Sequence, residues 1–506
     1  MKRTIRNIFL ATISGVFGVL AFPPFGYSFL GWIALTPLIF AAKGASGRDS
    51  FLYGYLAGAV FFSGVLYWLP NVTVPGAIVL VLVLAAFYGL FAVVASIVTK
   101  YSMDVLLLSF VWVVLEFIRS NLFTGFPWAL LGASQYKMLN IIQIADITGV
   151  YGVSFLMAAF GAALFALLDR SERKISYMMV ALLFVLVSSM YGNYRMSPGK
   201  YPADMKISVV QGNIPQRFKW DADVAEEIVA EYTRLTEKAA EEGPDLVIWP
   251  ETSFPFLVPG GAGAPGAVTE LVSETGVPLL AGIIYRDNGT VYNAAALFEE
   301  DGMQIYRKNH LVPFGEYIPF EDMLGSFRGL IDKPIGDFGR GNGFSLFDIS
   351  TTRTFVDGSN TVSRQTSFFK FGVMICFEDV FPYIAREFCA SGADLLVNIT
   401  NDAWFGRTAA AEQHLISSVF RAVENRVPVV RAANTGISGF IDPIGEVYSR
   451  VYREGKDIFV EGYDTENIYI YPGGSLYTLY GDIFVYFCAV MMLLIITLEA
   501  LRLRRK

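Results

Sequence analysis

A cysteine placed between an apolar run and two carboxylates is the feature of this sequence that most directly suggests chemistry. Cys376 follows the apolar stretch 371–375 and precedes Glu378 and Asp379. An isolated buried cysteine usually packs as a small hydrophobic residue. A cysteine that ends a strand-like run beside acidic side chains is instead where a nucleophile would sit, if other segments supply a base and a positive charge.

Two upstream segments supply those groups. The apolar run 245–249 leads into Glu251, and the turn-rich segment 306–317 carries Lys308 and Glu316. A cysteine attacks a carbonyl carbon as the thiolate, so it needs a base or a nearby positive charge that favours ionisation. We interpret Glu251 as the general base, and Lys308 as the cation that stabilises first the thiolate and then the oxyanion of a tetrahedral intermediate.

Histidine is the more usual base for a cysteine, and the chain has two. His310 lies in the Lys308 segment and His414 in a predicted amphipathic helix; both contexts are more typical of structural histidines, but a Cys–His pair stays open. Two histidines are too few for a histidine-based metal cluster, and we find no zinc, P-loop or dinucleotide motif. The net charge of −7 gives no indication of nucleic-acid binding. We therefore expect no metal, no cofactor and no nucleic-acid partner.

The composition places part of the chain in a membrane. Hydrophobic residues make up 54% of the 506 residues and charged residues only 17%, which is too apolar for an ordinary soluble protein. About eight stretches are long enough to be candidate spans. They are residues 8–22, 28–42, 52–69, 77–98, 103–119, 151–168, 176–191 and 483–501.

Basic residues predict the orientation of these spans, because they favour cytoplasmic loops. Both termini and alternate loops carry them, whereas the short loops 22–27 and 70–76 carry none. We therefore expect both termini in the cytoplasm and the long segment between the last two spans outside. Cys376 is then a free thiol in an oxidising compartment, which catalysis would explain. We interpret Cys389 and Cys488 as structural.

The chain divides into three parts by composition. Residues 1–192 form a bundle of seven spans, 193–478 an extramembrane domain, and 479–506 a closing span with a basic tail. In the extramembrane part, strand-like runs alternate with the amphipathic segments 222–242 and 412–426, which predicts an α/β layer protein. The segment 338–360 is rich in turn residues and predicts a loop or hairpin.

One stretch of the predicted bundle is unusual. Residues 117–132 are apolar and aromatic but interrupted by glycine and proline, which is typical of a re-entrant or interfacial segment. Glu116 and Arg119 lie three residues apart at its start. We favour a mutually neutralised pair at a helix end over a role in binding a lipid headgroup.

The motifs together resemble the nitrilase superfamily of carbon-nitrogen hydrolases, whose Glu-Lys-Cys triad occurs in this order on an αββα sandwich. The resemblance covers most of residues 206–447. With the predicted spans, the chain is similar to the apolipoprotein N-acyltransferase family over nearly its whole length. The motifs that carry this second resemblance are Gln211–Gln216, Trp249–Thr252, Lys308–Glu316, Cys376–Asp379, Asn401–Gly406, Ala433–Gly439 and Phe123–Trp128. Phe377 departs from the family, in which a tyrosine often follows the nucleophile.

This resemblance implies acyl transfer in two steps in the bacterial inner membrane, with the catalytic domain facing the periplasm. Cys376 would take an acyl chain from a membrane phospholipid as a thioester. The α-amine of an N-terminal S-diacylglyceryl-cysteine on an apolipoprotein would then accept it. Glu251 and Lys308 would keep the roles given above, Glu316 would orient Lys308 or the nucleophile, and Glu378 would support the pocket. We expect a monomer.

Four further residues are candidates for substrate contacts. Trp404 and Phe405 lie in a loop motif, where they could contact lipid or pack beneath the loop. Trp220 is a weaker lid candidate. Asn293 lies in a predicted strand, where its amide could join the network of the active site or make ordinary ladder bonds.

Two other functions remain open from the sequence. A membrane-tethered amidase or nitrilase would use the same triad with water as the acceptor, although a soluble substrate would not need so many spans. A transporter or lipid-binding scaffold with an inactive domain is the alternative outside enzymes. The intact triad argues against it, as does the lack of a set of ionisable residues in the middle of the predicted spans beyond Glu116 and Arg119.

Overall fold

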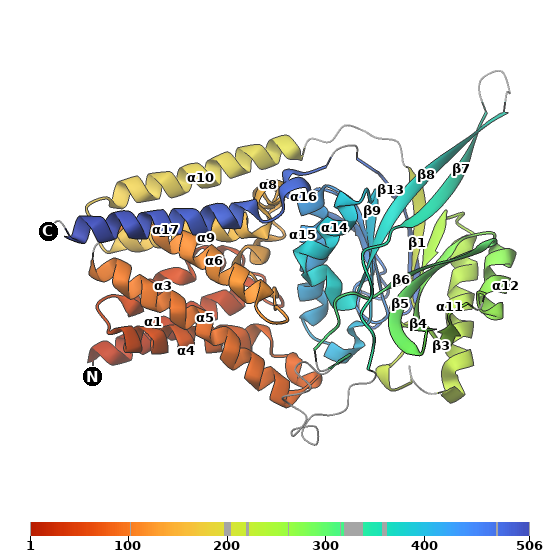
Figure 1. Ribbon diagram of the computed structural model, residues 1–506, viewed down its shortest axis with the longest axis horizontal. Helices are drawn as coiled ribbons and strands as arrows, with labels where there is room; N and C mark the ends of the chain where they lie inside the picture. The colour runs from red at the N-terminus through yellow and green to blue at the C-terminus, as the bar shows by residue number, and fades with distance from the viewer. Residues whose placement is uncertain are drawn as a thin grey trace. The chain divides into compact units, whose positions relative to one another are not determined.

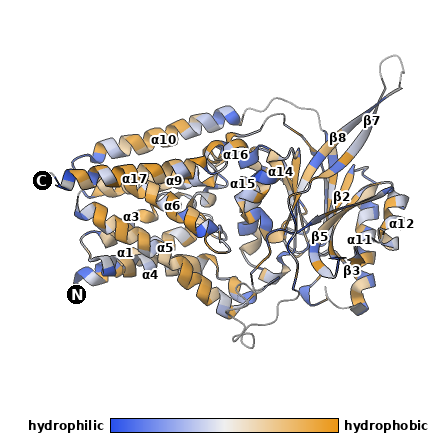
Figure 2. Cartoon of the chain, viewed as in Figure 1, coloured by the Kyte–Doolittle hydropathy of each residue, from blue (hydrophilic) through white to orange (hydrophobic). Residues whose placement is uncertain are grey.

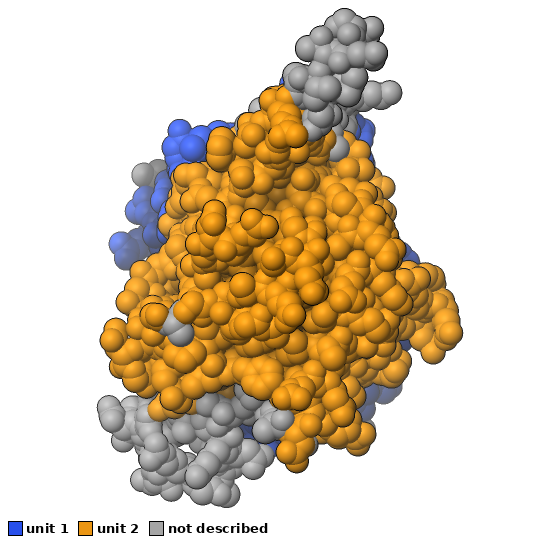
Figure 3. Space-filling view, turned by 90° about the vertical axis from the view of Figure 1, so that its right-hand side faces the viewer, with its two compact units in different colours: residues 1–198, 408–424, 475–506 blue, residues 199–407, 425–474 orange. Residues whose placement is uncertain are grey.

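The computed structural model describes residues 2–101, 103–196, 204–218, 222–261, 263–313, 315–317, 337–356, 362–471 and 474–504. The chain forms two compact units, coloured separately in Figure 3. The first contains residues 1–198, 408–424 and 475–506, and the second contains 199–407 and 425–474. The segment 408–424 therefore counts with the first unit, which the sequence patterns do not indicate. The functional boundaries at 192/193 and 478/479 stay a prediction.

The first unit is helical (Figure 1). Its main helices are α1 (Lys2–Ala21), α2 (Phe29–Ile33), α3 (Leu35–Ala42), α4 (Gly47–Val65), α5 (Val74–Lys100), α6 (Leu107–Asn121), α9 (Val150–Leu168), α10 (Lys174–Arg195), α15 (Ala410–Asn425) and α17 (Ile483–Arg504). Among the described residues, α1, α5, α9, α10 and α17 are long and apolar enough to cross a membrane. They are mainly hydrophobic along their lengths (Figure 2).

Each expected span coincides with one helix or a pair of helices. The expected span at 28–42 is divided into α2 and α3 at Ala34, and the one at 103–119 becomes the 15-residue α6. Thr73 caps α5 by accepting a hydrogen bond from the backbone N–H of Gly76, and a proline lies in the first turn. A capping residue and a proline at a helix start are visible in the sequence, which explains why the start of α5 lies close to the start of the expected span.

Two small residues bring α4 and α5 together. A Cβ atom at Gly54 or Gly58 would overlap the backbone of α5 around Ala85, Tyr88 and Gly89. Their spacing is that of the G-x-x-x-G motif, which lets helix backbones approach closely where there is no water to drive association. Packing between these two helices therefore depends on the absence of side chains at both positions.

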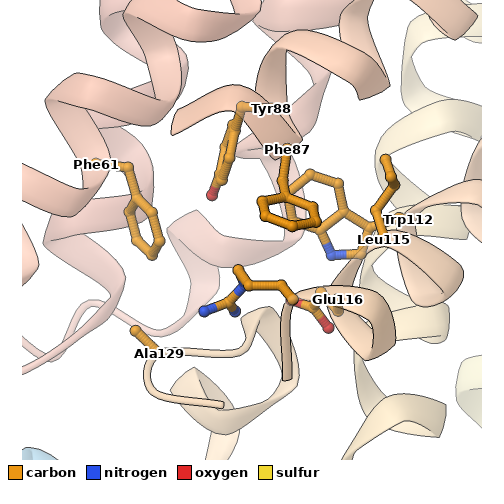
Figure 4. Close-up of a pocket in the computed structure, with 8 residues that line it drawn as sticks. Phe61, Phe87, Tyr88, Trp112, Leu115, Glu116 and Ala129 are labelled. Carbon is orange, nitrogen blue, oxygen red and sulfur yellow. The ribbon is translucent and has the colours of Figure 1, made fainter. Parts of the chain in front are cut away.

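A small pocket in this unit is lined by aromatic side chains from α4, α5 and α6 together with Glu116 and Arg119 (Figure 4). Arg119 is buried, and its Nη1 donates to the carbonyl oxygens of Phe126 (2.9 Å) and Trp128 (2.8 Å). Glu116 Oε1 accepts from the backbone N–H of Leu131 at 2.7 Å. The two charges attract each other, as expected, and each one also binds the backbone of the segment that follows α6. That segment lies where the sequence indicates a re-entrant stretch.

The second unit contains two sheets. The first runs in the order β13-β1-β2-β4-β5-β6, with β3 also paired to β4, and the second runs β12-β11-β10-β9-β8-β7. The strands of the first sheet are β1 (Met205–Gln211), β2 (Leu246–Ile248), β3 (Phe254–Pro259), β4 (Leu279–Asp287), β5 (Thr290–Glu299), β6 (Gly302–Arg307) and β13 (Gly462–Ile468). Those of the second are β7 (Phe347–Val356), β8 (Val362–Ile375), β9 (Leu395–Thr400), β10 (Val429–Ala433), β11 (Gly439–Ile441) and β12 (Val447–Arg450).

Helices cover the outer faces of these sheets. The amphipathic α11 (Ala225–Ala240) and α12 (Gly266–Thr275) pack on the first sheet around a core that includes Tyr232 and Trp249, and α14 (Pro382–Ala390) packs on β8 and β9 (Figure 1). Strands β1, β2 and β4 are mutually parallel, as are β8, β9 and β10, so residues after their carboxyl ends gather at one edge of each sheet. The expected αββα sandwich is confirmed. The segment 338–360 contributes β7, one arm of a hairpin with β8.

Candidate active site

The three expected catalytic residues each follow a strand of the second unit. Glu251 comes three residues after β2, Lys308 directly after β6, and Cys376 directly after β8. Buried apolar residues precede Glu251 and Cys376, a more exposed strand precedes Lys308, and each of these polar residues follows the end of its strand. Strands of both sheets thus contribute to one cluster of charges.

Glu251 lies close to β4 because of a glycine. A Cβ atom at Gly282 would overlap the backbone of Glu251 and Thr252, and the N–H of Gly282 donates to the carbonyl of Pro250 at 3.1 Å. Thr252 has a φ of +48°, a left-handed conformation that is strained for a β-branched residue. Glu251 is therefore held by a close backbone contact and a strained turn, which is common at functional sites.

Lys308 lies between two carboxylates. Its Nζ is 2.9 Å from Glu316 Oε1 and 3.5 Å from Glu251 Oε1, and the side chain is 1% exposed. Asn293, on β5, donates from Nδ2 to the same two oxygens at 2.7 Å and 2.8 Å. The backbone N–H of Val312 holds the second oxygen of Glu316 at 2.8 Å. The structure therefore brings Glu251, Lys308, Glu316 and Asn293 together.

These carboxylates keep Lys308 charged. Burial by itself would lower the pKa of the ammonium, but Glu316 and Glu251, followed by Cys376 and Glu378, outweigh it, and the pKa is raised above its ordinary value. A buried lysine without such partners would tend to lose its proton. Lys308 is thus a fixed positive charge that can stabilise an oxyanion.

Cys376 begins a short 3-10 turn, η6 (Cys376–Val380), and has a φ of +53°. Burial raises the pKa of its thiol, Glu251 raises it further, and Lys308 and the hydroxyl of Thr400 lower it, with a raised pKa as the net result. At neutral pH the resting group is therefore a thiol, and a base has to remove its proton during attack. Glu251 is the carboxylate with the largest effect on the pKa of this thiol, which makes it the candidate base.

The two histidines have other partners. His310 Nδ1 is hydrogen-bonded to Tyr383 Oη at 2.9 Å, and its ring stacks on Phe381 with centroids 3.7 Å apart. His414 lies in the first unit against Trp128. The groups that shift the Cys376 pKa include neither residue, and the alternative of a Cys–His pair is not supported.

Glu378 connects the nucleophile to the lysine segment. Its carboxylate is fully buried and accepts from the backbone N–H groups of Ile375 (2.8 Å), Asn309 (2.7 Å) and His310 (2.9 Å), and from Tyr306 Oη at 3.0 Å. Burial raises the pKa of Glu378 to about 7, although the backbone N–H bonds lower it. Glu378 thus contacts the segments that carry Cys376 and Lys308, and its role as a supporting residue of the pocket stays a prediction.

The expected lipid-contact residues are found in different situations. Trp404, in the turn η7 (Asp402–Phe405), is 36% exposed, which favours an outward-facing aromatic over a buried plug. Phe405 beside it is half-buried. Trp220 lies outside the described residues.

One buried residue of the second sheet was not predicted from the sequence. Arg431 on β10 is fully buried, and it is the lone charged residue in the apolar run 427–433. A charged residue in such a run is the pattern that indicates a buried, paired side chain.

The site is built from acid, amide, amine, thiol and hydroxyl side chains. These groups can perform nucleophilic attack on a carbonyl, with proton transfer and oxyanion stabilisation by neighbouring side chains. Within the part of the chain that the structure describes, no group of three or more histidine, cysteine, aspartate or glutamate side chains is arranged to hold a metal ion.

Known proteins resemble both units. Residues 14–163 match the apolipoprotein N-acyltransferase N-terminal domain, and residues 206–469 match the carbon-nitrogen hydrolase domain. Among solved structures, a CN-hydrolase superfamily protein from Xanthomonas campestris is similar with a TM-score of 0.37 and 18% identity, over 53% of this chain and 91% of that one.

Relatives that align with nearly the whole chain share one name. The apolipoprotein N-acyltransferase of Geobacter metallireducens is 37% identical over 99% of this chain and 96% of its own length. That of Pasteurella multocida is 29% identical over 100% of this chain and 98% of its own. Because similarity at this level extends through the helical unit and the unit with the Glu-Lys-Cys cluster, this chain belongs to the apolipoprotein N-acyltransferase family.

Proposed function

We propose that this chain transfers a fatty acyl chain from a membrane phospholipid, through a thioester on Cys376, to the α-amine of an N-terminal S-diacylglyceryl-cysteine on apolipoproteins. The observation that carries the proposal is the electrostatic interaction of the half-buried Cys376 thiol with Glu251 and with a charged Lys308, which is itself paired with Glu251, in a chain of this family. The nitrilase-like fold alone would also fit a hydrolase, and membership in the acyltransferase family favours transfer.

The first half-reaction begins with proton transfer. Glu251 takes the proton of the Cys376 thiol as the sulfur attacks the ester carbonyl carbon, and the oxyanion forms beside the Lys308 ammonium. Collapse of the intermediate breaks the ester C–O bond. The alkoxide of the lysophospholipid takes the proton back from Glu251 and leaves an acyl thioester on the enzyme.

The second half-reaction uses the same groups. The neutral α-amine attacks the thioester carbonyl, Glu251 accepts a proton from the nitrogen, and Lys308 again faces the oxyanion. Collapse breaks the C–S bond, and the thiolate recovers its proton. Asn293 and Glu316 hold Glu251 and Lys308 in place through both steps. Trp404 and Phe405 are the proposed aromatic contacts with lipid.

We also propose eight spans in the bacterial inner membrane, with both termini cytoplasmic and the second unit in the periplasm. The five long apolar helices, the α2–α3 pair, α4 and α6 correspond to the eight apolar stretches. The distribution of basic residues supports the orientation. Holding both lipid substrates in one membrane raises their local concentration at the thiol, and a monomer would suffice.

Intact-protein mass spectrometry tests this proposal. Purified enzyme incubated with phospholipid and no acceptor should gain one fatty-acyl mass that maps to Cys376. Adding a diacylated lipopeptide should remove that mass and produce an N-acylated peptide. Cys376→Ser should abolish turnover and leave the protein in the membrane, and Cys389→Ser is the matched control that should behave like the wild type. An unmodified Cys376 in folded enzyme, or free fatty acid as the final product, would overturn the proposal.

A further inference from the structure

A buried arginine lies behind the nucleophile in the second sheet. Arg431 on β10 is fully buried, although arginine is rarely so unless it is paired. Its Nη1 donates to Asn398 Oδ1 at 2.6 Å and to Asp379 Oδ2 at 3.1 Å, and its Nη2 donates to Asp402 Oδ2 at 3.1 Å. Its Nε donates to the carbonyl of Ile437 at 3.1 Å. One guanidinium thus joins β9, the turn after the nucleophile and the loop that carries Trp404.

The contact with Asn398 determines which way that amide faces. Arginine only donates hydrogen bonds, so the oxygen of the Asn398 side chain has to face Arg431. Its nitrogen then faces the nucleophile strand, where Nδ2 donates to the carbonyl oxygens of Met374 and Cys376, both at 3.1 Å. Arg431 therefore acts on Cys376 through Asn398, and the peptide that it restrains belongs to a residue in the strained left-handed conformation.

The contacts with the two aspartates connect the nucleophile turn to the aromatic loop. Asp379 ends the motif that begins at Cys376, and Asp402 begins the turn that contains Trp404. Both carboxylates are nearly inaccessible to solvent, and Arg431 is the cation that pairs with each of them. The hydroxyl of Thr400, the same group that lowers the Cys376 pKa, donates to Asp402 Oδ1 at 3.3 Å.

We propose that Arg431 is a positioning residue for the acyl-transfer reaction: it holds the Cys376 turn and the 402–405 loop in one ion-paired cluster and offsets the charge of Asp402 near the nucleophile. This inference rests on the proposed function. It assigns Arg431 no contact with the substrate.

The electrostatic part of this role has a definite sign. The charged groups that act on the thiol are Glu251 after β2, Lys308 after β6 and Asp402 after β9; Glu316 and Glu378 act on Lys308. Asp402 disfavours the thiolate, and Arg431 is its ion-pair partner. Replacing Arg431 with a neutral residue should therefore make the thiol harder to ionise, and neutralising Asp402 while Arg431 remains should make it easier.

Two measurements on full-length enzyme in detergent separate this role from general support of the fold. The first is the single-turnover rate of thioester formation on Cys376 with phospholipid. The second is the rate of Cys376 alkylation by iodoacetamide as a function of pH, which needs no acyl donor. The variants are Arg431→Met and Asp402→Asn, and Arg450→Met is the matched control because it breaks a half-exposed Arg–Asp pair in the same sheet.

Arg431→Met should slow thioester formation by about tenfold or more, because a displaced nucleophile loses its attack geometry. Its alkylation profile should move to higher pH by about one unit, and that of Asp402→Asn should move to lower pH. Arg450→Met should match the wild type in both assays. Opposite shifts are not expected from loosened packing alone, which would move both profiles the same way.

Arg431→Met with the wild-type rate and profile would overturn the inference. If that variant does not fold, Asp402→Asn decides: an alkylation profile that stays in place or moves to higher pH contradicts the role. A wild-type enzyme that never forms the thioester would refute the proposed function instead, and the alkylation profiles would still test the cluster.

Discussion

The backbone conformation of Cys376 makes a prediction about stability. A left-handed φ costs a residue with a Cβ atom roughly 1–2 kcal/mol, whereas glycine adopts it freely. We expect Cys376→Gly to unfold with a free energy about 1 kcal/mol above that of Cys376→Ala, measured by denaturant titration in detergent.

The matched control is Cys389, in the last turn of the ordinary helix α14. There the order should reverse, and Cys389→Gly should be less stable than Cys389→Ala by up to about 1 kcal/mol. The same order at both positions would mean that the strain at Cys376 is absent in solution.

The raised pKa of Glu378 predicts that the free energy of unfolding depends on pH. Burial raises its pKa from 4.5 to about 7, so between these values the native state holds a proton that the unfolded state has released. The native state binds more protons in this window, so this group makes the free energy of unfolding fall as pH rises from about 4.5 to about 7. Its contribution is complete at lower pH and lost above about 7.

The comparison of wild type with Glu378→Gln isolates this effect, since the other titrating groups are shared. The free energy of unfolding of the wild type minus that of Glu378→Gln should fall by up to about 3 kcal/mol as pH rises across that window. Denaturant titrations at several pH values would measure it. A difference that stays constant with pH would show that Glu378 titrates normally.

The sequence predicts the residues that react better than the residues that hold them. Glu251 and Cys376 follow apolar runs in the sequence and Lys308 lies in a turn-rich segment, and the structure places each of them after a strand. Arg431 was not singled out, because its three side-chain partners are spread over residues 379–402 and only sheet pairing brings them together. A contact network across parallel strands has no local pattern.

At the scale of elements, one glutamine side chain attaches helix α15 to the rest of the helical unit. Gln413 Oε1 accepts from the indole N–H groups of Trp68 and Trp128, both at 3.0 Å, and its Nε2 donates to the carbonyls of Pro23 and Val65 at 3.0 Å and 3.1 Å. All of these residues belong to the first unit. The amide thus binds three connecting segments of the bundle to one helix, with every bond that it can make in use.

Gln413→Leu should therefore destabilise the protein by at least about 2 kcal/mol, because it leaves buried donors and acceptors without partners. Thermal unfolding in detergent, followed by tryptophan fluorescence, would detect the loss. Gln365→Leu replaces an exposed glutamine on β8 and should change the stability by less than about 0.5 kcal/mol. Equal effects of the two variants would contradict a special role for Gln413.

Helices with a clear apolar period could be predicted from the sequence, whereas the division of a segment into short helices could not. The segments expected as helices at 222–242 and 412–426 became α11 and α15, within a few residues. The division of 28–42 into α2 and α3, and the membership of 408–424 in the first unit, depend on tertiary packing. Hydropathy reports how apolar a segment is, and it does not report which neighbours the segment packs against.

The whole molecule makes one prediction about topology, which follows from the basic loops. Glu172, between α9 and α10, and Glu300, between β5 and β6, are both exposed glutamates in turns. In a variant without native cysteines, Glu300→Cys should react with a membrane-impermeant maleimide added to cells with a permeabilised outer membrane. Glu172→Cys should react only after the inner membrane is also disrupted, because the proposed orientation places it in the cytoplasm. Labelling of Glu172→Cys in cells with an intact inner membrane would place the second unit on the opposite side, away from acceptors outside the cytoplasm.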